Sequence, residues 1–63
     1  MELRNALPTN RNTHIRIFCG PQTIFQGERA DISDNEWNVK VGPYMDCKVL
    51  SANTINGRMI FAI

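Results

Sequence analysis

The sequence predicts a mainly β fold, either a small antiparallel meander or a small barrel of four to five strands, with one short helical turn near residues 33–36. Two observations predict this fold class. Asn56-Gly57 stands between two apolar runs, and this dipeptide is the strongest short-range hairpin signal, because a type I′ turn needs φ > 0 at both central residues. Upstream, Ile15, Ile17 and Cys19 recur at every second position, which is the period of a β-strand.

A two-residue turn at Asn56-Gly57 sets the register of the C-terminal hairpin, residues 44–63. Thr54 should then lie opposite Met59, and Ala52 opposite Phe61. Both faces of the hairpin are apolar. The expected core face carries Leu50, Ala52, Met59, Phe61 and Ile63, and the opposite face carries Val49, Ser51, Ile60 and Ala62. Because a sheet that is apolar on both faces needs cover on both, we expect a second layer there, either the N-terminal arm or another chain.

Residues 14–28 predict a first hairpin. Its strands are interrupted at Gly20-Pro21, where Pro21 suits the second position of a turn. A tight turn at Pro21-Gln22 would place Phe18 opposite Phe25, an aromatic cross-strand pair of the kind that stabilises strand pairing.

Residues 28–41 support two interpretations. Ser33 followed by Glu36 matches a capping box, which begins a helix. In contrast, Trp37, Val39 and Val41 alternate with polar residues, which is strand periodicity. We therefore expect a helical turn over 33–36 and a short strand over 37–41, ended by the Gly-Pro pair that follows.

Residues 1–13 are expected to form an N-terminal arm ahead of a single small β domain, residues 14–63. One helical turn over residues 2–7 should end before Pro8, since a proline disfavours the helical region for the residue that precedes it. Residues 9–13 show no apolar periodicity, which predicts a loop or a partly disordered lead-in.

Gly-Pro pairs recur at residues 20–21 and 42–43, each after a short apolar segment. Together with Asn56-Gly57 they predict a meander with three hairpin turns. Five short strands in this arrangement resemble the layout of SH3-like and other small barrels. This is a likeness of architecture; no family motif is matched, and fold alone implies no function.

A chain of 63 residues forms one domain with a marginal core, which a disulfide, a metal or a partner subunit would reinforce. The net charge of +1 gives no strong field toward nucleic acid or membranes. Neither a signal peptide nor an apolar stretch of about 20 residues is present, so a cytoplasmic location and no membrane association are expected. Cys19 and Cys47 match no zinc spacing. A bridge between them stays open, but in a reducing compartment two free thiols buried on strands are the preferred expectation.

The residues that catalysis requires are sparse, so a non-enzymatic protein without a cofactor or metal is expected. His14 is the one histidine and stands at a strand end with no evident nucleophile or orienting partner. Ser33 and Ser51 lie in no nucleophile motif, and the glycines are scattered singly instead of forming a phosphate loop.

The preferred hypothesis is a protein-binding module that self-associates, because the core is small and an open meander has edges that pair readily. Such a protein could be a phage-like accessory protein, an inhibitor that binds and blocks a host protein. The candidate partner-binding residues combine two aromatic residues, two apolar residues of the second hairpin face and two acids: Trp37, Tyr44, Val49, Ile60, Asp34 and Glu36.

The alternative hypothesis is a small barrel that binds nucleic acid through basic side chains and stacking aromatic rings. The basic candidates are Arg4, Arg11, Arg16 and Lys48, together with Lys40 and Arg58; the aromatic candidates are Phe18, Trp37 and Tyr44. The acidic segment 28–36 argues against this alternative, because it would repel phosphates.

Overall fold

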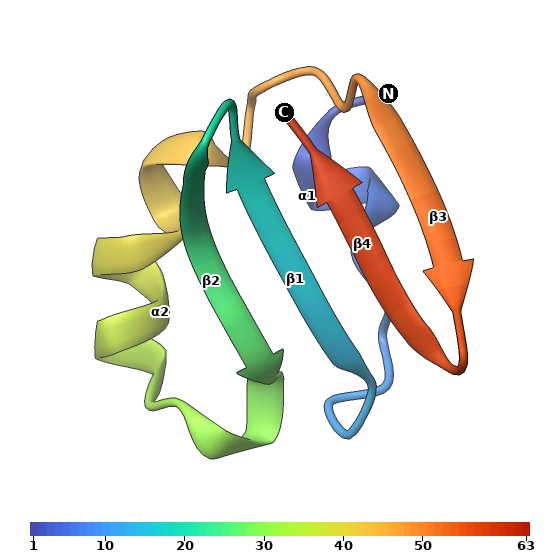
Figure 1. Ribbon diagram of the computed structural model, residues 1–63. Helices are drawn as coiled ribbons and strands as arrows, with labels where there is room; N and C mark the ends of the chain where they lie inside the picture. Colours follow the sequence, from blue (N-terminus) through green and yellow to red (C-terminus); the bar gives the residue numbers. More distant parts are fainter.

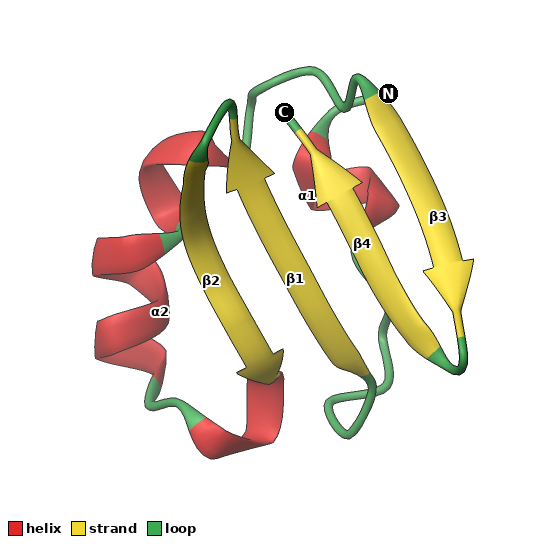
Figure 2. Cartoon of the chain, in the orientation of Figure 1, coloured by secondary structure: helices red, strands yellow, loops and turns green.

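The computed structural model describes residues 1–63 as one four-stranded sheet with helical segments packed on one of its faces (Figures 1 and 2). The strands are β1 (His14–Cys19), β2 (Gln22–Glu28), β3 (Ser51–Ile55) and β4 (Arg58–Ala62). Their order across the sheet is β2-β1-β4-β3, and β1 runs parallel to β4. The predicted mainly β class is confirmed, but the sheet is mixed and is not closed into a barrel.

The C-terminal hairpin has the predicted turn and register. Asn56 and Gly57 have φ values of 52° and 77°, as a type I′ turn requires. Ala52 lies opposite Phe61, and Thr54 opposite Met59. Two members of the expected core face are exposed: Leu50, at 77%, precedes the first residue of the edge strand β3, and Ala52 lies on that edge strand, all of whose residues are exposed.

The first hairpin has a different register from the predicted one. Its turn is Gly20-Pro21, with Gly20 at a φ of 57°. The register of the ladder also shifts at a bulge between the Ile17 and Phe18 pairs. Phe18 therefore lies opposite Thr23, while Phe25 lies opposite Ile17. The expected Phe18–Phe25 pair is wrong, since the bulge places these two rings on opposite faces of the sheet.

Residues 34–40 form a helix, so the strand predicted for 37–41 is wrong. The helix α2 (Asp34–Lys40) begins at the capping box, where the Ser33 hydroxyl oxygen accepts a hydrogen bond from the Glu36 amide at 3.2 Å. Trp37 and Val41, one helical turn apart, are both buried, whereas Val39 is 70% exposed. The helical spacing of these two core residues determines the conformation. The Gly-Pro pair at 42–43 then begins the short 3₁₀ helix η2 (Gly42–Tyr44) instead of a hairpin turn.

The N-terminal arm is an integral part of the fold. Helix α1 (Leu3–Ala6) ends before Pro8 as predicted, with Leu7 extended. The Leu3 side chain is fully buried, and its amide donates to the Cys47 carbonyl at 2.9 Å. Residues 9–13 form the loop that leads from this helix to β1.

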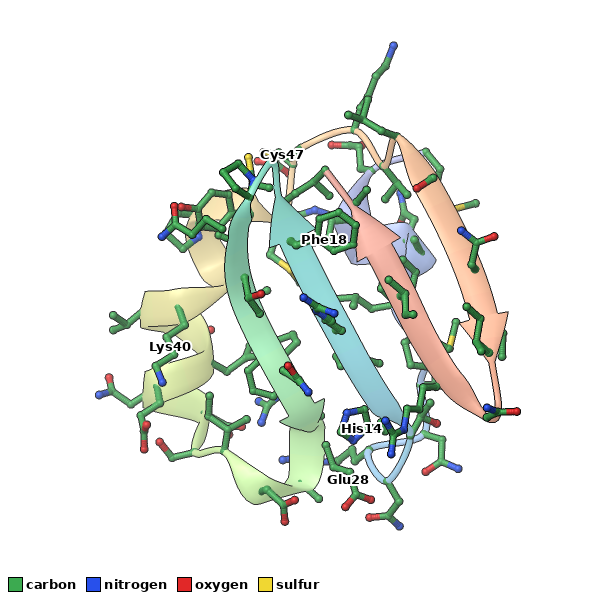
Figure 3. All side chains as sticks on the ribbon, in the orientation of Figure 1. His14, Phe18, Glu28, Lys40 and Cys47 are labelled. Carbon is green, nitrogen blue, oxygen red and sulfur yellow. The ribbon has the colours of Figure 1, made fainter.

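The core lies between the sheet and the helices. Its six buried residues come from the N-terminal arm, from α2 and its C-cap, and from the two central strands: Leu3, Ile15, Ile17, Trp37, Val41 and Phe61. The opposite face of the sheet, which we call the open face, points toward the viewer in Figure 3 and has no helix over it. Cys19 and Cys47 are free, as expected, but both are exposed because one ends a strand at a turn and the other lies in a bend.

Candidate interaction surfaces

The outer edge of β3 is the most exposed strand edge of the molecule. Every residue of β3 is exposed, and its ladder partner is β4 alone. The two-residue turn makes Ile55 and Arg58 a hydrogen-bonded pair, and hydrogen-bonded and non-hydrogen-bonded pairs alternate along an antiparallel ladder. The backbone N–H and C=O groups of Ala52 and Thr54 therefore point away from β4. The strand, Ser-Ala-Asn-Thr-Ile, contains neither a charged residue nor a proline. Residues of these two kinds commonly prevent an exposed edge strand from pairing with another strand.

Large exposed apolar side chains gather around this edge. Of the four that stand out in the molecule, Leu50 (77% exposed) adjoins β3 and Ile55 (55%) ends it. Met1 (76%) lies close to the start of β3, since its carbonyl accepts the Val49 amide at 2.9 Å. In Figure 1 the N-terminus is drawn beside the beginning of β3. The edge therefore combines unpaired backbone groups with apolar side chains at both ends.

The other edge of the sheet, β2, is better protected. A cleft of about 260 Å³ separates β2 from α2 and is lined in part by Glu28, Asp31, Glu36 and Lys40. Charged side chains at a strand edge oppose the approach of another strand, because pairing would bury them. The two edges therefore differ, and only β3 offers an unprotected ladder.

The open face carries a cationic and apolar group of side chains on β1 and β4. The parallel register places Arg16 beside Ile60, and Phe18 beside Ala62. The Arg16 guanidinium lies 5.7 Å from the centre of the Phe18 ring, a cation–π contact, and also reaches the Thr23 hydroxyl at 3.5 Å. Figure 3 shows the Phe18 ring in front of the sheet, with His14 at the opposite end of β1.

The ion pairs of the molecule lie away from the open face. Arg4 pairs with Asp46, while Arg29 and Arg11 both pair with Asp34, at 2.5 and 3.8 Å. The hydrogen bond from Arg29, followed by the positive charge of that guanidinium, lowers the pKa of the Asp34 carboxyl below its ordinary value. Asp34 thus holds two arginines, one from the N-terminal arm and one from the short 3₁₀ helix η1 (Arg29–Asp31) that follows β2.

Trp37, predicted at an interface, lies inside the molecule at 8% exposure. Its ring meets Phe25 edge-to-face, with centroids 5.3 Å apart, and the Arg29 guanidinium covers it at 4.8 Å. The side chain of Arg29 also donates to the Ile32 carbonyl at 3.0 Å. This arrangement makes Trp37 a packing residue that joins α2 to β2.

The other predicted partner-binding residues do not form one surface. Tyr44 and Val49 are half-buried and pack against the core, whereas Ile60 lies on the open face. Asp34 and Glu36 are exposed on the first turn of α2. The expected second hairpin face is thus split, because the chain before β3 turns toward the N-terminal arm. Sequence reasoning missed the β3 edge, whose only signal was its lack of charge and proline.

The basic residues predicted for nucleic acid binding are also divided. Arg4 and Arg11 pair with acids, and the backbone of Lys48 forms an isolated antiparallel β-bridge with that of Glu2 in the N-terminal arm. Of these four basic candidates, Arg16 alone lies on the open face. Arg58, a further basic candidate, joins it there, since it precedes Ile60 by two residues on β4.

Comparison with protein-family models, with curated proteins and with solved structures gives no match for this chain. None of its helices has the length and apolar character needed to cross a membrane. No group of three or more His, Cys, Asp or Glu residues comes together in a way that could hold a metal ion. The arguments for function therefore rest on the two surfaces described above.

Proposed function

We propose that this chain is a protein-binding module that pairs, through the edge strand β3, with a second copy of itself. The observation that supports the proposal is the exposure of an uncharged strand with outward backbone groups at Ala52 and Thr54. Adding a strand to an open edge is a common mode of polypeptide recognition, in which the backbone supplies the hydrogen bonds.

The sequence of β3 suits pairing with itself about a two-fold axis at Asn53. In the antiparallel register centred on Asn53, Ala52 lies opposite the partner's Thr54, and Thr54 opposite the partner's Ala52. Both residues then use the backbone groups that point away from β4. A register shifted toward the N-terminus would need Leu50, but its amide already donates to the Ala62 carbonyl at 2.7 Å. The register centred on Asn53 is therefore the one that satisfies the outward groups.

The apolar side chains at the two ends of the edge support the same arrangement. In this register the Ile55 side chain lies beside the partner's Ser51, at the end of the partner's strand. The two-fold axis repeats this contact at the other end of the strand. Burial of apolar area contributes about 25 cal/mol per Å², so these side chains add to the hydrogen bonds of the ladder. One short strand buries less than the roughly 1,600 Å² of a standard interface, and a weak, reversible dimer follows.

Sedimentation equilibrium tests the proposal. The wild-type chain should approach twice the 7.2 kDa monomer mass as its concentration rises through the micromolar range. Asn53→Lys should remain monomeric over the same range, because the dimer would hold two ammonium groups opposite each other at the two-fold axis.

Asn38→Lys is the matched control, since it makes the same chemical change at an exposed position of α2. It should dimerise like the wild type. A wild-type chain that keeps the monomer mass at high micromolar concentration would refute self-association. Equal dissociation of the two variants would show that net charge, and not the β3 edge, controls the mass.

A further inference from the structure

We propose that the open face of the sheet, over β1 and β4, binds single-stranded nucleic acid. The proposal concerns a surface within one chain and does not depend on pairing at β3. A two-fold axis perpendicular to the sheet would leave the open faces of both copies exposed on the same side. Each copy could then bind alone.

Charge is the first observation that favours this ligand. Arg16 and Arg58 are two basic residues without an acidic partner, and both lie on the open face. The segment that would repel phosphates, residues 28–36, is located at the β2 edge and on α2 (Figure 3). Only its first residue, Glu28, shares the open face, opposite His14 at one end of β1 and β2. Over β1 and β4 the face is therefore cationic.

The second observation is the position of the Phe18 ring. Phe18 is half-buried on a face that no helix covers, with Arg16 at 5.7 Å from the ring centre. A base can stack on such a ring while the neighbouring guanidinium contacts a phosphate, which is the combination found in proteins that bind single strands. A duplex hides the faces of its bases, so the ring favours a single strand.

The shape of the face provides room for the chain of a ligand. Arg58, Ile55, Asn56 and Ile60 line a hollow of about 330 Å³ at the turn of the β3–β4 hairpin. Arg16 lies beside Ile60, and Phe18 follows two residues further along β1, toward the other end of the face. A strand that crosses the sheet along β1 would meet Arg58 first, then Arg16, and then the Phe18 ring.

Fluorescence anisotropy with a labelled oligothymidylate, a single strand without stable pairing, tests the proposal. The wild-type chain should bind at low salt, and binding should weaken as salt rises, because phosphate contacts release counterions. Arg16→Gln and Arg58→Gln should each reduce affinity several-fold and lower the steepness of the salt dependence by about 0.7 for each phosphate that is no longer neutralised. Phe18→Leu keeps an apolar side chain and should reduce affinity roughly tenfold, because the base no longer stacks on an aromatic ring.

Arg11→Gln is the matched control, since it removes the same charge from an exposed arginine of the N-terminal arm. It should bind like the wild type, and a duplex of the same length should bind more weakly than the single strand. No binding at low salt, or an equal loss in Arg11→Gln and Arg16→Gln, would overturn the proposal. Equal competition by polyglutamate and by unlabelled oligothymidylate would also overturn it, because the face would then bind any polyanion.

The outcome is separable from that of the dimer experiment. Binding with a stoichiometry of one site per chain in a monomeric protein would support the open face and refute pairing at β3. A dimer that fails to bind the oligonucleotide would support pairing at β3 and refute binding at the open face.

Discussion

At the scale of single residues, Arg29 shows how one side chain can make several contacts in a chain with a small core. It covers the ring of Trp37 at 4.8 Å, donates to the Ile32 carbonyl and pairs with Asp34. Its side chain is 20% exposed, so its apolar stem adds to the packing while its charge is met by the carboxylate. One arginine thus links the end of β2 to the start of α2.

The pH dependence of stability should report this link. Because the pKa of Asp34 is lowered below 3.8 in the folded chain, its contribution to stability is complete above that value. The contribution is lost as the pH falls through the folded-state pKa. We expect the urea midpoint of the wild type to fall as the pH drops below about 4. In Asp34→Asn the midpoint should fall less over the same pH range.

Asp31→Asn is the control for this measurement, since Asp31 is an exposed carboxylate of the same segment and takes part in no ion pair. Its acid profile should match that of the wild type. A profile of Asp34→Asn that coincides with the wild-type profile between neutral and acid pH would mean that the pairing with Arg29 contributes nothing measurable, as is common for exposed ion pairs.

At the scale of elements, the N-terminal arm is as much a part of the fold as the strands. Leu3 is completely buried between α1 and the sheet, and the backbone of the arm bonds to residues 45–49. Leu3→Ala should lower the free energy of unfolding by about 2–5 kcal/mol, because apolar burial is removed and a cavity is left behind. A domain of this length has roughly 3–9 kcal/mol in total, so the variant should be close to unfolding at room temperature.

Urea denaturation followed by circular dichroism measures this effect, with Met1→Ala as the control. Met1 is 76% exposed, so its truncation should change the stability by no more than about 0.5 kcal/mol. Leu3→Val, which removes less volume, should lie between the two variants and keeps the test informative where Leu3→Ala fails to fold. Equal stabilities of all three variants would mean that the arm is dispensable.

The elements differ in how far the sequence predicts them. The hairpin at Asn56-Gly57 was predictable with its register, because a local turn with positive φ at two residues determines it. For the helix over 34–40, the start was predicted, because the capping box is a local signal. Its continuation through Trp37 was not, because the choice between helix and strand depends on whether Val39 packs in the core together with Trp37 and Val41. The bulge at Ile17/Phe18 and the parallel pairing of β1 with β4 arise from tertiary packing and have no local signal.

The same distinction explains the candidate surfaces. An interface was predicted from the apolar character of both hairpin faces, and this pattern included Ile60, which lies on the open face. Arg16 and Phe18 share a face because they lie two residues apart on β1, whereas the position of Ile60 beside Arg16 and the identity of β3 as the open edge depend on the strand order. Trp37 was predicted at an interface and lies in the core, because the alternation of residue types does not tell which face another element covers.

At the scale of the whole molecule, the accessible surface indicates that one chain can fold alone. Its area is 4233 Å², close to the roughly 4,100 Å² that the size scaling of monomeric proteins gives for 7.2 kDa. The sheet is shielded on one face by its own helices, and the core closes without another subunit. Pairing at β3 would therefore add stability to a monomer that is already folded, in contrast to an obligate dimer.

This conclusion predicts how the unfolding temperature depends on protein concentration. For the wild type, the midpoint should rise with concentration, because the dimer binds only folded chains and mass action favours it. For Asn53→Lys, the midpoint should be independent of concentration, while the far-ultraviolet circular dichroism spectrum keeps the wild-type shape. Differential scanning calorimetry at several concentrations measures both midpoints. Loss of the native spectrum in Asn53→Lys, or in the wild type on dilution to the monomer, would contradict a self-sufficient core, since six buried residues would then be too few to hold the sheet without its partner.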